Sequence, residues 1–328
     1  MNKLSAGIIG LGSMGKNHLR VLKSIPEVEV KAIFDSNPLQ IETNPEISLS
    51  NSIEEFFKNK FDYVVVATPT NYHEEYAIRA LDAGSSLLIE KPIAITYASA
   101  SRIVNHAKLL KKEISVGHIE KFNAASIEAK QKIQDGILGT ILQISTRRIG
   151  PHPHRISDVG VTLDLCSHDI QLTMWLLGKR YKNVFAVTKS ISRQGNEDLI
   201  MASGILEDQI IFNHTVNWVS PTKERIITIL GEKGSLVIDT LQSNLTFFES
   251  GGNVVSNPQL SLHTGYSQGE SRSFAFDKPE PLLTEHLSFI NYLNGQNSEI
   301  VTGEMALETV RVCEAFIQSA RDSRVIEI

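Results

Sequence analysis

The chain has 328 residues, of which 41% are hydrophobic and 21% are charged, so it is long enough for two packed domains of ordinary globular composition. Its formal net charge of −5 and isoelectric point near 6.1 exclude the concentrated basic surface that a nucleic-acid partner requires. No apolar run approaches the roughly 20 residues of a membrane span, and Cys166 and Cys313 are too few for a disulfide framework. We therefore expect a cytoplasmic protein whose two cysteines are thiols.

The N-terminal segment predicts a phosphate-binding loop. Residues 4–9 form a short apolar run, which is followed by a Gly-x-Gly-x-x-Gly pattern and then a helical stretch to about residue 25. In such a strand–turn–helix, the first glycine permits a tight turn, the second lets the backbone approach a pyrophosphate, and the third lets helix and strand pack closely. The predicted cofactor-binding loop consists of Gly10, Gly12, Ser13, Met14 and Gly15.

An acidic residue at the expected distance indicates which dinucleotide binds. A second strand over residues 28–34 ends in Asp35, which lies 20 residues beyond Gly15. A carboxylate there accepts hydrogen bonds from a free ribose hydroxyl and repels a 2′-phosphate, so the predicted cofactor is NAD and not NADP. The alternative is that Asp35 only opens the turn formed with the Ser-Asn-Pro that follows it.

The rest of the first 119 residues alternates strands with helices, which predicts a parallel, doubly wound sheet. Residues 36–50 lack helical periodicity, so the helix expected between the second and third strands is predicted to be absent or reduced to a turn. Strands are expected over 62–68, 86–89 and 114–118. Helices are expected over 52–59 and 96–110, and a further helix is expected to end at residue 83. Ligands bind at the carboxyl ends of such strands, which here carry Thr68, Pro69, Thr70, His73, Glu90 and Lys91.

Lys91 is the first candidate catalytic residue. It follows a strand, and Pro92 restricts its backbone to extended conformations, with a cis bond as one option. An ammonium group held there could hydrogen-bond a reacting oxygen and stabilise the charge that develops on it. The alternative is a surface lysine paired with Glu90.

From Glu120 onward the pattern changes to one helix and a series of strands with short turns, which predicts a largely antiparallel sheet over residues 120–328. One face of such a sheet is not covered by the chain's own helices, so one hypothesis is that subunits contact each other through that face. Residues 251–281 are predicted to be a long loop, either a cover for the substrate or a plain connection. Helices over 283–293 and 304–320 end the chain.

Residues 155–178 carry the second group of candidate catalytic residues. Asp164 and His168 are four residues apart, so a helix places both on one face. An imidazole there could take a proton from a substrate hydroxyl while the carboxylate fixes its tautomer. The alternatives are an ordinary helical pair, or a metal site that also includes His152 and His154. No metal is predicted, because the two loop histidines have no fixed spacing to the helix.

Together these motifs resemble the Gfo/Idh/MocA oxidoreductase family. The resemblance rests on the glycine loop, Glu90-Lys91-Pro92, Val116-Gly-His118 and the segment from Gly160 through Asp164 to His168 and Asp169. It implies a Rossmann domain followed by an α/β domain whose open sheet mediates oligomerisation, as a homodimer or homotetramer. It also implies that Lys91 and His168 serve in proton transfer at a substrate carbinol and that Asp164 assists.

Residues 116–178 have a narrower similarity to UDP-N-acetylglucosamine 3-dehydrogenases, which implies a nucleotide-sugar substrate oxidised to a ketone. The predicted substrate-binding residues are Lys91, His118, Arg148, Arg155, Asp164 and His168. Strand alternation places Arg147 and Arg148 on opposite faces, so only one of them would reach the ligand. Two alternatives stay open: an inositol or free-sugar dehydrogenase with the same mechanism, and a dinucleotide-binding regulator without turnover.

Overall fold

The computed structural model describes residues 3–37, 47–152, 158–191, 195–251 and 269–328. Contacts divide the chain into two compact units, and each is described by itself. Unit 1 comprises residues 1–119, 156–159 and 280–314, and unit 2 comprises 120–155, 160–279 and 315–328. No helix within the described ranges is both long enough and apolar enough to cross a membrane.

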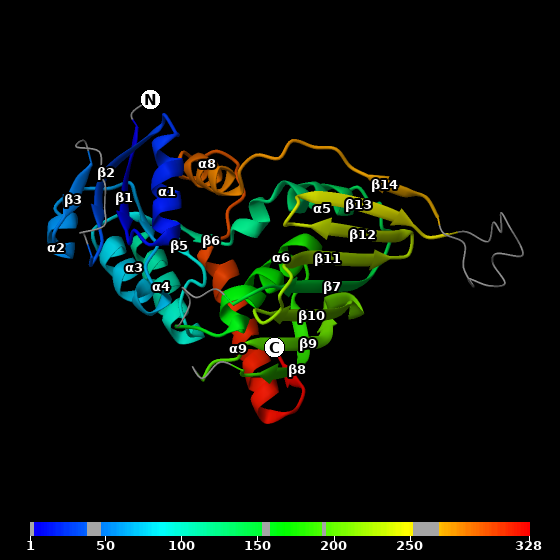
Figure 1. Cartoon of the computed structure of the whole chain (residues 1–328). Helices are drawn as coiled ribbons and strands as arrows, with labels where there is room; N and C mark the ends of the chain where they lie inside the picture. The colour runs from blue at the N-terminus through cyan, green and yellow to red at the C-terminus, as the bar shows by residue number, and fades with distance from the viewer. Residues whose placement is uncertain (1–2, 38–46, 153–157, 192–194, 252–268) are drawn as a thin grey trace, which may run out of the picture. The chain divides into compact units, whose positions relative to one another are not determined.

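Unit 1 is built on a six-stranded sheet in which every described pair of neighbours is parallel, in the order β3-β2-β1-β4-β5-β6 (Figure 1). Its strands are β1 (Leu4–Ile9), β2 (Val28–Phe34), β3 (Ser48–Ser50), β4 (Tyr63–Val66), β5 (Ser86–Glu90) and β6 (Ile114–Gly117). Strand β4 is buried on both faces, which explains why it is a continuous apolar run instead of an alternating one.

Helices cover both faces of this sheet. Its helices are α1 (Ser13–Lys23), α2 (Ile53–Phe56), the short 3₁₀ helix η2 (Thr70–Tyr72), α3 (His73–Asp82), α4 (Tyr97–Leu110), α8 (Pro281–Leu293) and the first part of α9 (Gly303–Asp322). Figure 1 shows α1 in blue beside α8 in orange. Both pack on one apolar cluster, in which Tyr63 of β4 meets Phe289 of α8 with ring centroids 5.5 Å apart. A helix from the C-terminal part of the chain therefore completes the core of unit 1.

Unit 2 is built on a nine-stranded sheet in the order β14-β13-β12-β11-β7-β10-β9-β8-β15. Its described neighbours are antiparallel, except that β7 and β10 run parallel. The strands are β7 (Ile141–Ile149), β8 (Tyr181–Lys189), β9 (Leu199–Leu206), β10 (Ile211–Asn217), β11 (Glu224–Gly231), β12 (Gly234–Asp239), β13 (Asn244–Glu249), β14 (Ser271–Ser273) and β15 (Ile326–Glu327).

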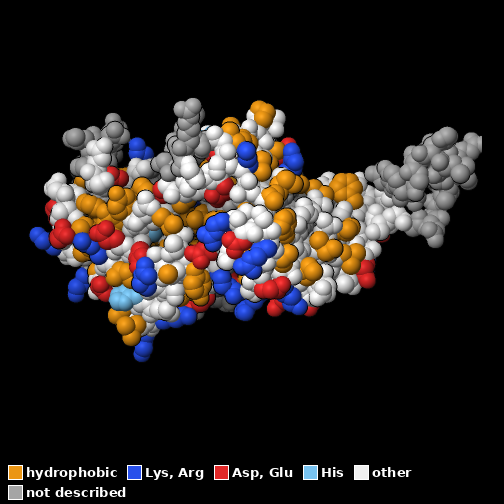
Figure 2. All heavy atoms as spheres, turned by 90° about the horizontal axis from the view of Figure 1, so that it is seen from below, with side chains coloured by type: hydrophobic (Ala, Val, Ile, Leu, Met, Phe, Trp, Pro, Cys, Tyr) orange, Lys and Arg blue, Asp and Glu red, His pale blue; other side chains and the backbone are white. Residues whose placement is uncertain are grey.

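The two faces of this sheet differ. On the inner face, Ile144, Phe212 and Ile229 pair across strands and are buried, and this face is covered by α5 (Ala124–Gln134), the π-helical turn η4 (Thr162–Cys166) and α6 (Ser167–Leu177). On the outer face, hydrophobic side chains are exposed, among them Phe185, Met201, Ile211, Leu230 and Phe248. Figure 2 shows hydrophobic side chains lying between polar ones in the half of the view that holds these strands.

These observations confirm the expected fold class: a parallel Rossmann sheet plus a second domain with a mostly antiparallel sheet. Some elements were not predicted. Strand β3 lies inside the stretch expected to be irregular, and β14 lies inside the predicted loop 251–281. The expected loss of the helix after β2 concerns residues 38–46, which lie outside the described residues.

Candidate active site

The glycine loop has the geometry of a pyrophosphate site. Gly10 has φ +92°, and a Cβ atom there would lie 2.7 Å from the Ala67 carbonyl oxygen. A Cβ atom on Gly15 would lie 1.9 Å from the Gly10 carbonyl oxygen, so this glycine is needed where helix α1 meets β1. A Cβ atom on Gly12 would meet nothing within 4 Å. The space beside Gly12 is thus where a ligand can approach the backbone.

The N-terminus of α1 faces the same space. Gly12 is the N-cap residue and offers no side chain to the helix, and the first turn holds no acidic residue. The first intrahelical bond runs from Lys16 N to Gly12 O at 3.1 Å, so the preceding amides of Ser13, Met14 and Gly15 have no acceptor within the helix. An anionic pyrophosphate fits these donors.

Asp35 follows β2 and is tied to the glycine loop. Its Oδ2 accepts a hydrogen bond from Leu11 N at 2.6 Å, and its Oδ1 accepts one from Asn37 N at 2.8 Å. The carboxylate is therefore held one residue from Gly12. This position suits the ribose of an adenosine whose pyrophosphate lies over the loop.

His73, at the start of α3, joins two of the loops that follow strands. Its Nε2 lies 2.9 Å from the Thr68 carbonyl oxygen and its Nδ1 lies 2.9 Å from the Pro92 carbonyl oxygen. Burial lowers the pKa of His73, although both carbonyl contacts oppose that shift. In the loop after β4, Thr70 N also donates to Oδ2 of Asp158, a residue that follows β7, at 2.9 Å. His73 thus fixes the loop after β4 against the loop after β5.

Glu90 and Lys91 stand at the carboxyl end of β5. The Lys91–Pro92 peptide is cis, and Lys91 is half-buried. Glu90 Oε2 accepts from Lys91 N at 3.1 Å, and Glu90 Oε1 lies 3.0 Å from Nε2 of the buried His18 on α1. Glu90 therefore binds the backbone of Lys91 and a histidine of the first helix.

His118, directly after β6, is buried near Lys91. Burial lowers its pKa to about 3, and the positive charge of Lys91 adds to this shift. His118 is therefore a neutral imidazole at physiological pH, able to donate or accept a hydrogen bond without adding charge.

The candidate residues of unit 1 line one edge of its sheet. In strand order they are Asp35 after β2, the glycine loop after β1, Thr68 after β4, Lys91 after β5 and His118 after β6. Neighbouring strands are about 4.8 Å apart, so the row from β2 to β6 spans about 19 Å. An extended dinucleotide with its adenosine at Asp35 would have its other end near Lys91.

In unit 2, Asp164 and His168 lie at the start of the segment that runs from η4 into α6. Both are buried, and Asp164 lies in a π-helical turn, a geometry that is frequent at functional sites. The amide of Thr162 donates to Glu197 Oε1 at 3.0 Å, and a Cβ atom on Gly160 would lie 2.3 Å from that carboxylate. Glu197 thus caps this segment, and Gly160 leaves room for it.

Arg148 lies beneath the same helix. Its Nε lies 3.1 Å from both carboxylate oxygens of Asp169, and its Nη1 donates to Glu120 Oε1 at 2.8 Å. Although burial opposes its charge, these two carboxylates raise the pKa of Arg148. Arg147 is exposed on the outer face and pairs with Glu224, so the two arginines lie on opposite faces as strand alternation predicts.

Within each unit, the structure therefore brings the predicted residues together. Arg155 and His154 lie outside the described residues, and His152 packs on Trp218 with ring centroids 5.1 Å apart. No group of three or more His, Cys, Asp or Glu side chains in the described ranges could hold a metal ion.

Glu285 on α8 is an acidic side chain that the sequence analysis missed. It is fully buried, and neither carboxylate oxygen has a hydrogen-bond partner among the described residues. Burial, with the charge of Glu90 adding to it, raises the pKa of Glu285 well above its ordinary value of 4.5. Its position in an apolar helix gave no sign of this, because α8 was not expected to pack against unit 1.

We expect Glu285→Gln to raise stability at pH 8 and not at pH 4.5. The unfolded chain loses the Glu285 proton near pH 4.5, whereas the folded chain loses it only at higher pH. The contribution of protonated Glu285 to stability is therefore fully present below pH 4.5 and is lost as pH rises through the folded pKa. Gln cannot ionise and removes that loss. At each pH we compare the melting temperature of the variant with that of wild type. The variant minus wild-type difference should be at least about 2 °C larger at pH 8 than at pH 4.5. An equal difference at both pH values would contradict the protonated state of Glu285.

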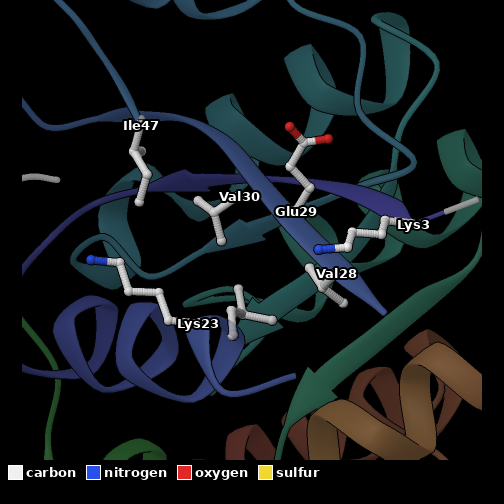
Figure 3. Close-up of a pocket in the computed structure, with 7 residues that line it drawn as sticks. Lys3, Lys23, Val28, Glu29, Val30 and Ile47 are labelled. Atoms are coloured by element: carbon white, nitrogen blue, oxygen red, sulfur yellow. The ribbon is translucent and has the colours of Figure 1, made fainter. Parts of the chain in front are cut away.

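A separate hollow of unit 1 lies away from these residues. Figure 3 shows it against the amino-terminal half of β2, lined by Lys3, Leu22, Lys23, Val28, Glu29, Val30 and Ile47. At about 3.3 Å per residue, Val30 is about 16 Å from Asp35 along the chain direction. The hollow is therefore at the end of the strand opposite to the cofactor residues.

Comparisons with known proteins agree with this geometry. Residues 4–118 match the family model described as an oxidoreductase family with an NAD-binding Rossmann fold, and residues 130–328 match that of its C-terminal alpha/beta domain. The chain is 25% identical to UDP-N-acetylglucosamine 3-dehydrogenase of Acidithiobacillus ferrooxidans, over 97% of this chain and 100% of that protein. It is 26% identical to myo-inositol 2-dehydrogenase of Thermotoga maritima, over 72% and 75%.

Solved structures share the fold at lower identity. The A. ferrooxidans enzyme superposes with a TM-score of 0.83 at 21% identity, covering 98% of this chain and 99% of that one. The WlbA dehydrogenase of Bordetella pertussis, in complex with NADH and UDP-GlcNAcA, superposes with a TM-score of 0.83 at 22% identity, covering 100% and 98%.

Proposed function

The chain belongs to the Gfo/Idh/MocA oxidoreductase family of NAD-dependent enzymes, and from this premise we propose that it oxidises a hydroxyl group of a nucleotide sugar to a ketone. The proposed substrate is a UDP-N-acetylhexosamine, oxidised at C3. The family match spans both domains, and one relative that matches over almost the full length of both chains is a UDP-N-acetylglucosamine 3-dehydrogenase. The protein is proposed to act in the cytoplasm.

The observation that carries the proposal is the row of residues along the carboxyl edge of the unit 1 sheet. When bound, NAD would supply the acceptor for the hydride that the substrate carbon gives up. We assign Asp35 to the adenosine ribose, the glycine loop to the pyrophosphate, and the loop of Thr68, Pro69 and Thr70, with His73 and Glu90 behind it, to the remainder of the cofactor. Lys91 and His118 then flank the reacting end.

Three side chains are proposed to handle the proton. His168 accepts the proton of the substrate hydroxyl, Asp164 orients the imidazole and stabilises its charged form, and Lys91 donates a hydrogen bond to the oxygen as its negative charge develops. The hydroxyl proton moves to His168, and the C–H electron pair leaves with the hydride. Arg148 and Arg155 are proposed to assist substrate binding. For Arg148 this means mainly holding Asp169, next to His168, through its bonds to that carboxylate.

A screen of UDP-, dTDP- and GDP-sugars for NADH formation tests the proposal. We expect absorbance at 340 nm to rise with a UDP-N-acetylhexosamine, and free UDP to compete with that substrate. If myo-inositol or a free sugar is oxidised and UDP has no effect, the free-sugar alternative replaces the proposal. Constant absorbance with every sugar would favour a regulator that binds the dinucleotide without turnover.

We further propose that the chain forms a homodimer or homotetramer through the outer face of the unit 2 sheet. Phe185, Met201 and Ile211 are exposed on three neighbouring strands there, and an uncovered apolar face favours self-association. Sedimentation should show an oligomer at micromolar concentration that Met201→Asp weakens. A wild-type monomer at that concentration would contradict this interface.

A further inference from the structure

A chain of buried hydrogen bonds leads from Glu90 through two histidines that the proposed mechanism does not use. His18 Nε2 on α1 lies 3.0 Å from Glu90 Oε1, and His18 Nδ1 lies 2.8 Å from His286 Nε2 on α8. Both histidines are fully buried, and their rings meet edge to face with centroids 5.0 Å apart. Residues from β5, α1 and α8 thus meet behind Lys91.

The positions of the ring protons determine the donor and the acceptor in each of these buried hydrogen bonds. His286 Nδ1 has no hydrogen-bond partner among the described residues, and a buried N–H group without an acceptor is costly. The proton of His286 therefore belongs on Nε2, which donates to His18 Nδ1. His18 then carries its own proton on Nε2 and donates it to the Glu90 carboxylate. Every donor in the chain points toward Glu90.

The surroundings of Glu90 agree with an ionised carboxylate at the end of this chain. Burial raises the pKa of Glu90, but the hydrogen bond and electrostatic attraction of His18, the charge of Lys91 and the bond from Lys91 N outweigh burial and lower it. The other titratable groups that face Glu90 come from four elements: His18 on α1, His73 on α3, His118 after β6 and Glu285 on α8, while His286 on α8 contacts His18. Burial lowers the pKa values of His73, His118 and His286 and raises the pKa of Glu285, so it disfavours the charged form of each of these groups. Glu90 is therefore the anion that balances the Lys91 ammonium.

We propose that His18 and His286 are positioning residues for Lys91: by donating in sequence toward Glu90, they keep its carboxylate ionised and fixed against the backbone of Lys91. The carboxylate uses one oxygen for His18 and the other for Lys91 N. A Cβ atom on Gly117 would lie only 3.2 Å from the second oxygen, so β6 also confines it. This inference rests on the proposed role of Lys91 and adds two residues far from it in the sequence.

The pH profile of kcat distinguishes a positioning role of His18 from a role in protein stability alone. Without its donor, Glu90 becomes easier to protonate and is held less firmly against the backbone of Lys91, so the ionised carboxylate is lost at a higher pH than in wild type. In His18→Leu we expect kcat to fall about 10- to 100-fold and the acid limb of the kcat profile to move to higher pH by about one unit, while KM for NAD changes less than about threefold. His18→Gln, whose amide can still donate to Glu90, should restore most of kcat and the wild-type profile.

Leu22→Ala supplies the matched control. Leu22 is buried one turn further along α1, in the apolar cluster that α1 and α8 share, so its truncation destabilises the same helix packing and leaves the donor His18 in place. We expect this variant to lower the melting temperature and to keep the wild-type pH profile. A His18→Leu profile with the wild-type shape, or a Leu22→Ala profile shifted to the same extent, would overturn the inference.

A measurement on the resting protein needs no substrate and so does not depend on the proposed reaction. Long-range ¹H–¹⁵N NMR of ¹⁵N-histidine-labelled protein reports which ring nitrogen carries the proton. We expect the Nε2–H tautomer for both His18 and His286 at pH 7.5, with signals assigned from the His18→Gln and His286→Gln variants. An Nδ1–H tautomer or an imidazolium at either position overturns the inference, whereas absence of NADH formation by wild type overturns the proposed function alone.

Discussion

Replacing His168 by asparagine or Lys91 by methionine is expected to lower kcat by about 10²- to 10⁴-fold, the range by which positioned acids and bases contribute to catalysis. The loss falls on the chemical step. His168 is proposed to collect the hydroxyl proton, and Lys91 to stabilise the oxygen as charge develops on it. The affinity for NAD, measured by titration calorimetry without sugar, should change by less than about threefold, because the glycine loop and Asp35 are unchanged.

The matched control for Lys91 is Lys108→Met. Lys108 is exposed on α4, where its Nζ lies 3.0 Å from Glu304 Oε1, and an exposed ion pair of this kind contributes at most about 1 kcal/mol to stability. We expect that variant to have wild-type turnover. If Lys91→Met also had wild-type kcat, or if His168→Asn only raised KM for the sugar, the proposed roles would be wrong.

The second large effect is expected at Gly12. Its φ of −62° is open to any residue and a Cβ atom there meets nothing within 4 Å, so Gly12→Val should fold with a melting temperature within about 2 °C of wild type. The added side chain fills the space where the pyrophosphate approaches the backbone. We expect the Kd for NAD to rise at least about 100-fold, which corresponds to about 2.7 kcal/mol.

Gly15→Ala serves as the contrasting variant. Its Cβ atom would lie 1.9 Å from the Gly10 carbonyl oxygen, so α1 must move away from β1 and the protein loses stability as well as NAD affinity. Thermal unfolding and NAD titration on both variants test this difference. Gly12→Val protein that binds NAD like wild type would show that the dinucleotide does not lie over this loop.

Features set by neighbouring residues could be predicted from the sequence. The strands around the glycine loop, the order of β and α elements in the first 119 residues and the alternation of Arg147 and Arg148 follow from turn chemistry and periodicity. The apolar run 4–9 coincides with β1, and the predicted strand 28–34 coincides with β2.

Features set by distant residues could not be predicted. His18 and His286 are 268 positions apart, and nothing in an apolar C-terminal helix indicates that it packs on α1. The carboxylate of Glu197 accepts a hydrogen bond from Thr162 N, 35 positions earlier in the sequence, and so caps the segment that holds Asp164. The π-helical turn at Asp164 has no sequence signature in the spacing of Asp164 and His168, because four residues suit an ordinary helix equally well. In each case tertiary contacts, and not local preference, decide the structure.

The central claim is that Lys91 of unit 1 and His168 of unit 2 act on the same substrate hydroxyl beside bound NAD. A crystal structure of the complex with NAD and the UDP-sugar identified by the screen measures this directly. We predict that Lys91 Nζ and His168 Nε2 both lie within about 2.6–3.2 Å of one hydroxyl oxygen, the range of a catalytic hydrogen bond. A complex in which the two nitrogen atoms contact different ligands, or lie on opposite sides of the molecule, would contradict the account.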